Sequence, residues 1–389
     1  MLISVLKLNV LAYALNVALI PWGSFMSRFP GYVTIITTIL LPFLAMNRSL
    51  TFEFYGEKKA FFFFCGILVA SLLLSLSEVA IDQNYILAIL GLACMYGTLS
   101  ISPTVYTEKD LEQFFLISKI LSVILIIYAV GPFQFKYSEY DEWGNTWFTL
   151  GFDNPNDIAV RIMFCVAMLL IETAYRRKLK YKLINTALAI GLIYVIILTE
   201  SRTSLICSCV MVAMIWLNRT PLKLWYVDIA IIIMISFIAV QLWLGTRENV
   251  VFLGKTVASG RQKLYASYMK EIVEKPWKFI VGDVGKYELA NSHNAAFAIV
   301  QNLGFLGLVC FVAFWKSLIR NSISSITNEV NKAAIFVLLI YIIYSSAEAA
   351  PMIGMIPHST PMLVIGRLSK DHLRRNSVYQ KKILRGYCR

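Results

Sequence analysis

Charged residues are scarce in this sequence, and histidine is almost missing. Of 389 residues, 15% are Asp, Glu, Lys or Arg and only three are histidine, whereas 58% are hydrophobic. Soluble domains contain about 25% charged and roughly 45–50% apolar residues. Apolar stretches near the length that crosses a hydrocarbon core of about 30 Å recur along the whole chain. The composition therefore excludes a soluble globular protein and predicts an all-α, polytopic integral membrane protein.

The sequence also lacks the short motifs of several familiar active sites. It contains no Cys-x-x-Cys, no His-Glu-x-x-His, no Gly-x-Ser-x-Gly, no Asp-x-Asp and no glycine-rich P-loop. Six of its seven cysteines lie in apolar stretches, which is typical of small core residues and not of a disulfide framework. We therefore expect neither a metal site nor a cofactor.

About twelve apolar segments are predicted to form transmembrane helices in a single membrane domain, residues 1–389. No signal-peptide cleavage pattern follows the first segment, so we expect it to remain as a membrane anchor. The last segment contains Pro357 and Pro361, which favours a partly re-entrant span. The segments lie at about 8–25, 31–47, 60–77, 84–102, 113–130, 157–174, 183–199, 203–217, 225–244, 295–315, 333–350 and 357–368.

The distribution of positive charge predicts the orientation of these spans. Lysine and arginine gather in the loops after every second span, as in 176–180, and in the basic tail 369–389, whereas the loop around 131–156 is acidic. Short cytoplasmic loops carry an excess of Lys and Arg. We therefore place both termini in the cytoplasm. The net charge of +13 follows the same rule, and nucleic acid is not an expected partner.

One predicted external loop, residues 245–292, breaks that rule. It carries eight basic and five acidic residues. A loop that stays basic on the external face favours an anionic ligand, such as a phosphate-bearing lipid. Within the loop, residues 261–274 place apolar side chains at helical spacing, and Pro276 is expected to stop that helix. This amphipathic helix either lies on the external surface of the membrane that the chain spans or packs against the helix bundle.

Two arginines stand at prominent positions on the predicted external face. Arg202 lies in a polar turn between two spans, residues 198–204. Either it pairs with Glu200 and holds the turn, or it faces a cavity and binds an anion through its guanidinium fork. Arg261 follows Gly260 at the start of the amphipathic helix. It is either a solvated surface charge or a ligand for phosphate oxygens beside free backbone N–H groups.

Two further polar motifs precede spans on the same face. His293 and Asn294 open the span from 295. His293 is either structural or a general base, because a neutral imidazole can accept a proton from an attacking hydroxyl. Asn154 belongs to the segment 151–157, where the plain interpretation is a helix cap at Asn156 or Asp157. Weaker candidates near the external ends of the last spans complete the set, namely Glu348 and His358.

Taken in order, these motifs resemble a known superfamily. The order is a Leu-Thr-x-Ser-Arg turn between spans, a large external loop with Gly-Arg, then His-Asn at the next span, followed by Gly-x-x-Gly. This arrangement is similar to the O-antigen ligases and the O-antigen or capsule polymerases of the bacterial inner membrane. The similarity is concentrated in residues 150–310, and the many-span topology extends it over the whole chain.

The resemblance implies a glycosyltransferase that acts on the periplasmic face without a metal ion or a nucleotide sugar. Its donor would be a glycan on undecaprenyl pyrophosphate, and membrane lipids would surround it. Arg202 and Arg261 would bind and neutralise the pyrophosphate, and His293 would activate the acceptor hydroxyl. Four further residues are predicted to contact the substrate: Asn154, Arg247, Lys263 and Asn294.

The resemblance leaves two activities open and makes a third less favoured. A ligase transfers the glycan to a sugar of the lipid A-core, whereas a polymerase transfers it to another lipid-linked repeat. The His-Asn form and the strongly basic chain favour the ligase, although some polymerases share both features. A flippase or transporter would be expected to show broken helices or intramembrane charges in corresponding halves, whereas the candidates here cluster in one external loop.

The predicted orientation can be tested with topology reporters. A reporter that is active only outside the cytoplasm should work when it is fused near Tyr140 and fail when it is fused near Lys178, because these positions lie on opposite faces. Measuring both fusions in the same cells provides the control for expression. The reverse pattern would refute the orientation.

Overall fold

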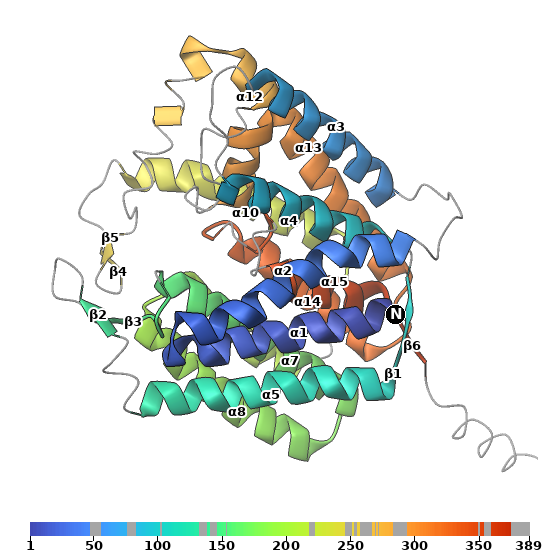
Figure 1. Cartoon of the computed structure of the whole chain (residues 1–389), viewed down its shortest axis with the longest axis vertical. Coiled ribbons are helices and arrows are strands. Elements are labelled where there is room, and N and C mark those ends of the chain that lie inside the picture. The colour runs from blue at the N-terminus through green and yellow to red at the C-terminus, as the bar shows by residue number, and fades with distance from the viewer. Residues whose placement is uncertain are drawn as a thin grey trace, which may run out of the picture.

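The structure is built of packed helices, as the predicted all-α class requires (Figure 1). Each apolar segment predicted from the sequence coincides with a helix. The computed structural model describes residues 1–46, 56–75, 83–101, 103–131, 138–140, 146–152, 154–217, 222–245, 251–252, 255–256, 267–268, 270, 272–282, 294–348, 351–353 and 359–374.

The helices follow one another along the chain with short connections. The first third contains α1 (Leu2–Leu19), prolonged by the 3-10 turn η1 (Ile20–Trp22), then α2 (Ser24–Met46), α3 (Gly56–Ser75), α4 (Gln83–Ser100) and α5 (Glu108–Val130). The middle contains α7 (Pro155–Arg176), α8 (Leu179–Thr199), α9 (Arg202–Leu217) and α10 (Trp225–Gly245). The last part contains α12 (Trp277–Val281), α13 (Ala295–Ser324), α14 (Glu329–Tyr344) and α15 (Ser359–Lys370).

Several of these helices have the length and composition of membrane spans. Among the described residues, six helical segments are long and apolar enough to cross a membrane: Leu2–Trp22, Phe25–Leu44, Glu108–Val130, Pro155–Arg176, Leu179–Thr199 and Ala295–Ser324. Three shorter apolar helices accompany them: Ile89–Ser100, Arg202–Leu217 and Trp225–Phe237. The structure thus has the character of a helical membrane protein, while the count of twelve spans remains a prediction.

Three short strand pairs mark the two ends of the bundle (Figure 1). At the end that holds the N-terminus, β1 (Val105–Thr107) pairs in parallel with β6 (His372–Arg374). At the opposite end lie two antiparallel hairpins, β2 (Ser138–Tyr140) with β3 (Thr146–Phe148) and β4 (Val251–Phe252) with β5 (Lys255–Thr256). We call these the N-terminal end and the hairpin end. None of these strands was predicted, because two or three residues are too few to show an alternating pattern.

Helix α7 forms the centre of the fold. Of its most apolar 18-residue stretch, 94% is buried, a much larger share than in the other long helices. It contacts α5, α8, α9 and α14, and Phe164 packs edge-to-face on Tyr13 of α1 with ring centroids 5.8 Å apart. Because α7 is enclosed by protein, it can carry polar side chains that a lipid-facing helix could not. Arg161 and Glu172 are both buried within it.

Ion pairs join the helices at the N-terminal end. Lys7 of α1 lies 2.7 Å from Asp110 of α5. The buried carboxylate of Glu172 lies 2.7 Å from Lys119 and 3.0 Å from Arg176, so two cations offset its charge. Removing both cations would leave the Glu172 carboxylate as an uncompensated buried charge, and breaking a buried pair in this way costs about 3–5 kcal/mol. These contacts therefore hold the N-terminal end in one arrangement.

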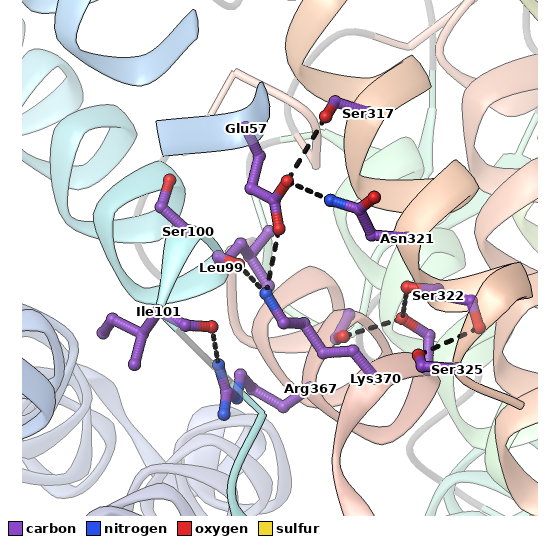
Figure 2. Close-up of polar contacts among 12 residues, drawn as sticks. Glu57, Leu99, Ser100, Ile101, Ser317, Asn321, Ser322, Ser325, Arg367 and Lys370 are labelled. Carbon is purple, nitrogen blue, oxygen red and sulfur yellow. Dashed lines mark hydrogen bonds and ion pairs between the residues drawn. The ribbon is translucent and has the colours of Figure 1, made fainter. Parts of the chain in front are cut away.

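A second buried charge cluster closes the same end, and Figure 2 shows its part around Glu57 and Lys370. Lys370 of α15 lies 3.5 Å from Glu57 of α3 and donates a hydrogen bond to the carbonyl oxygen of Leu99 at 2.8 Å. Arg367 pairs with Asp371, and both side chains are 1% exposed. The cluster balances two cations with two carboxylates, and it ties the last helix to α3 and α4.

Helix α13 contains a break at Gly304. This residue has φ +66° and ψ −171°, a conformation that is essentially restricted to glycine. A β-carbon at this position would collide with the carbonyl oxygen of Ile280 in α12. A β-carbon at Gly282, directly after α12, would likewise collide with the backbone of Asn302. The two glycines therefore allow α12 to pack closely against α13.

The Gly304 break predicts a specific loss of stability. Gly304→Ala should lower the free energy of unfolding by at least about 1–3 kcal/mol, because alanine is strained at this φ and its β-carbon collides with backbone. Gly66→Ala in α3 is the matched control, since nothing lies within 4 Å of its β-carbon position. Thermal unfolding of the purified proteins compares the two. A native melting temperature for Gly304→Ala would contradict the assignment of strain.

Candidate functional site

The junction between α8 and α9 presents Arg202 at the hairpin end. Helix α8 ends at Thr199, and Glu200 turns the chain with a left-handed φ of +54°. The backbone N–H of Ser201 donates to the hydroxyl of Thr199 at 3.3 Å. Helix α9 begins at Arg202. Arg202 is thus the first residue of a helix, and the dipole and backbone N–H groups of a helix N-terminus favour an anion.

Asn154 starts helix α7 at the same end of the bundle. Its side-chain oxygen accepts a hydrogen bond from the N–H of Asn156 at 2.9 Å, and Pro155 is the first helical residue. The expected cap at Asn156 or Asp157 is therefore wrong by at least two positions. The reason is Pro155, which lacks an N–H group and has the φ angle of a helix, so it suits the first position. Asn154 is consequently a helix cap, and its predicted contact with substrate stays a prediction.

Asn294 starts helix α13 and is completely buried. Its side-chain oxygen accepts a hydrogen bond from the N–H of Phe297 at 3.0 Å. Its amide nitrogen donates to the carbonyl oxygens of Met234 at 3.1 Å and Ser346 at 2.9 Å. These bonds fix the first turn of α13 against α10 and the end of α14. They give Asn294 a positioning role that the prediction of substrate contact had not anticipated.

Segment 344–348, at the end of α14, joins the three helix starts. Ser204, in the first turn of α9, donates to the hydroxyl of Tyr344 at 3.4 Å. The N–H of Ala295 donates to the carbonyl oxygen of Ser345 at 2.9 Å. The side chain of Asn156 donates to the carboxylate of Glu348 at 2.8 Å. Three motifs that are far apart in sequence therefore meet at one place, which is our candidate site.

Several predicted site residues lie outside the described residues. They are Arg247, Lys263, Arg261, His293 and the weaker candidate His358. Their roles remain predictions. The predicted helix 261–274 is described in part, and its Tyr268 is buried, donating to the carbonyl oxygen of Val300 at 3.0 Å. This contact favours packing of that segment on the bundle. Helix α12, which follows directly after Pro276, was not predicted.

Arg161 is a residue near the site that the sequence interpretation missed. It lies in α7, two turns from Asn154, and is 2% exposed. It donates to the carbonyl oxygen of Asp157 at 2.6 Å, and its guanidinium carbon lies 4.1 Å from the ring centre of Phe152. A signal was present, since Arg161 is the only arginine in the predicted span 157–174. Ionised residues within spans commonly mark functional positions.

The candidate site combines the guanidinium group of Arg202 with the carboxylate of Glu348 and several hydrogen-bonding side chains. Arg202 supplies a planar, permanently charged fork that matches the geometry of phosphate oxygens. Within the ranges that the structure describes, no group of three or more His, Cys, Asp or Glu residues is arranged to hold a metal ion. The described side chains thus offer cationic and hydrogen-bonding groups for a ligand.

Comparisons with known proteins add no relative to this picture. A scan against models of protein families gives no match, and a search of curated proteins finds no similar sequence.

Proposed function

We propose that this chain is an O-antigen ligase, a metal-independent glycosyltransferase of the bacterial inner membrane. It transfers a glycan from undecaprenyl pyrophosphate to a sugar of the lipid A-core on the periplasmic face. The predicted motifs carry this assignment. The structure supports it through one observation, namely that the three described motifs meet at segment 344–348 with Arg202 among them.

The meeting of these motifs matters because the proposed reaction needs the negative charge of its leaving group to be stabilised at one place. The acceptor hydroxyl oxygen attacks the anomeric carbon of the donor sugar, and the bond between that carbon and the pyrophosphate oxygen breaks. The leaving pyrophosphate gains negative charge as this bond breaks. Cationic groups that are already in place stabilise that charge without reorganising. Arg202 and Arg261 have this role in the proposal, and His293 takes the proton of the acceptor hydroxyl.

A polymerase is the alternative, and it uses the same donor chemistry. It differs in the acceptor, which would be a second lipid-linked repeat instead of the lipid A-core. Purified protein supplied with lipid-linked donor and either acceptor separates the two, with excess chelator present throughout. Transfer to the lipid A-core alone supports the ligase. Transfer only to the second repeat makes the protein a polymerase, and no transfer to either acceptor refutes both.

The arginine role predicts the effect of substitution at position 202. Arg202→Ala should reduce transfer by about 100-fold or more, because removing one donor to a developing oxyanion typically costs 10²–10³ in rate. Arg202→Lys should recover little, since a point charge cannot form the forked contact. Arg177→Ala is the control, because Arg177 is 68% exposed and pairs with Glu329 at the opposite end. Native transfer by Arg202→Lys would disprove the bidentate role, and Arg261 is tested in the same way.

The base role of His293 predicts a separation of rate from binding. His293→Ala should lower turnover by roughly 10²–10⁴-fold, the usual range for a general base. Affinity for the lipid-linked donor should change little, because the arginines make that contact. Turnover of the native protein should fall as the pH drops through the ordinary imidazole pKa, roughly 6.5. Turnover and donor affinity are measured on one folded preparation, and near-native turnover would end the assignment.

A further inference from the structure

The buried guanidinium group of Arg161 is satisfied in an unusual way. Its side chain is 2% exposed, and no carboxylate in the described part of the chain forms an ion pair with it. One guanidinium nitrogen donates to the carbonyl oxygen of Asp157, and the Nε atom makes no hydrogen bond. By contrast, the buried Lys370 at the N-terminal end has Glu57 as its partner. Arg161 therefore differs from the buried cations Arg367 and Lys370, which each have a carboxylate partner.

Aromatic rings offset part of the cost of burying the Arg161 charge. Arg161 lies in the second turn of α7. The rings of Phe152 and Tyr13 lie 4.1 and 6.0 Å from the guanidinium carbon, which offsets part of the cost. An unpaired buried charge still costs several kcal/mol. Such an arrangement is unfavourable for the isolated protein and favourable once an anion binds.

Other buried polar atoms near Arg161 also have no partner. The hydroxyl groups of Tyr13 in α1 and Tyr341 in α14 make no hydrogen bond, and the ring of Tyr13 lies 6.0 Å from the guanidinium carbon of Arg161. Tyr341 lies beside Tyr344, with ring centroids 6.2 Å apart. Tyr344 accepts the hydrogen bond from Ser204, two residues after Arg202. Hydroxyl groups without a hydrogen bond thus lie both beside Arg161 and beside Tyr344 of the candidate site.

From this arrangement we infer that Arg161 is a second anion-binding residue of the site. Its Nε–H group donates a hydrogen bond to an oxygen of a phosphate group. The hydroxyl groups of Tyr13 and Tyr341 are the neighbouring donors. Phe152 is only partly buried and covers the guanidinium group, so a rotation of its ring would open access. The inference rests on the proposed function in one respect: that function is the reason for choosing a polyprenyl phosphate as the ligand.

Stability and binding measured together test this role. Arg161→Met removes the charge and keeps the bulk, so it should leave the melting temperature of the ligand-free protein unchanged or raise it. The same variant should bind undecaprenyl phosphate about 10–100-fold more weakly than the native protein, as expected for the loss of a charged hydrogen bond. Binding is measured in phosphatidylcholine nanodiscs from the lipid-induced shift in melting temperature. Neutral undecaprenol and inorganic pyrophosphate are the comparison ligands.

Lys370→Met is the matched control. It should lower the melting temperature, because it leaves the buried Glu57 carboxylate without its cation, and it should keep native affinity for the lipid. If Arg161→Met loses affinity for pyrophosphate and for undecaprenyl phosphate to a similar extent, the site binds phosphate groups of both free and lipid-linked ligands. Loss of undecaprenyl phosphate binding alone would support a lipid headgroup site.

Three results would overturn the inference. They are native lipid affinity in folded Arg161→Met, equal binding of undecaprenol and undecaprenyl phosphate by the native protein, and failure of both Arg161→Met and Arg161→Gln to fold. The last would make Arg161 a structural residue. The proposed function fails separately: an Arg161-dependent shift with undecaprenyl phosphate in a protein that transfers no glycan would preserve this inference and reject the glycosyltransferase.

Discussion

The cost of placing ionised side chains inside an apolar bundle governs the arrangement of this protein. At the N-terminal end, buried Glu172 contacts two cations, and the Glu57–Lys370 and Arg367–Asp371 pairs close the last helix onto α3 and α4. At the hairpin end, the buried Arg161 has a carbonyl oxygen and two aromatic rings in place of a carboxylate. These cations of the N-terminal end thus have carboxylate partners, and in our proposal an anionic ligand takes that place for Arg161.

Asparagine side chains position the candidate site. Asn154 and Asn294 each cap the helix that they precede, and Asn294 also donates two bonds across the bundle. Because the amide group both accepts and donates, one residue can fix a helix start and tie it to a neighbour. A serine cap has a single O–H donor and could not make both of the bonds that Asn294 donates. This explains physically why asparagine suits position 294.

Much of the helical layout could be predicted from local hydrophobicity, and the site only in part. The apolar segments coincide with helices. They could be predicted because an apolar run of membrane length consists of consecutive residues and needs no knowledge of distant contacts. The cap at Asn154 was misplaced because several neighbouring residues are good caps. The role of segment 344–348 could not be read from the sequence, because its contacts join it to residues such as Asn156, 192 positions away. Arg161 carried a signal that was overlooked.

The parallel pairing of β1 with β6 has a consequence for biosynthesis. These strands are separated by more than 260 residues, as are Arg367 and its hydrogen-bonded partner Ile101. The segment that completes the packing of α3 and α4 is therefore translated long after these helices. Until then Glu57 lacks Lys370, and a buried acid without its cation is costly. A chain that ends before α15 would thus lack both the β1–β6 pairing and the cation of this acid.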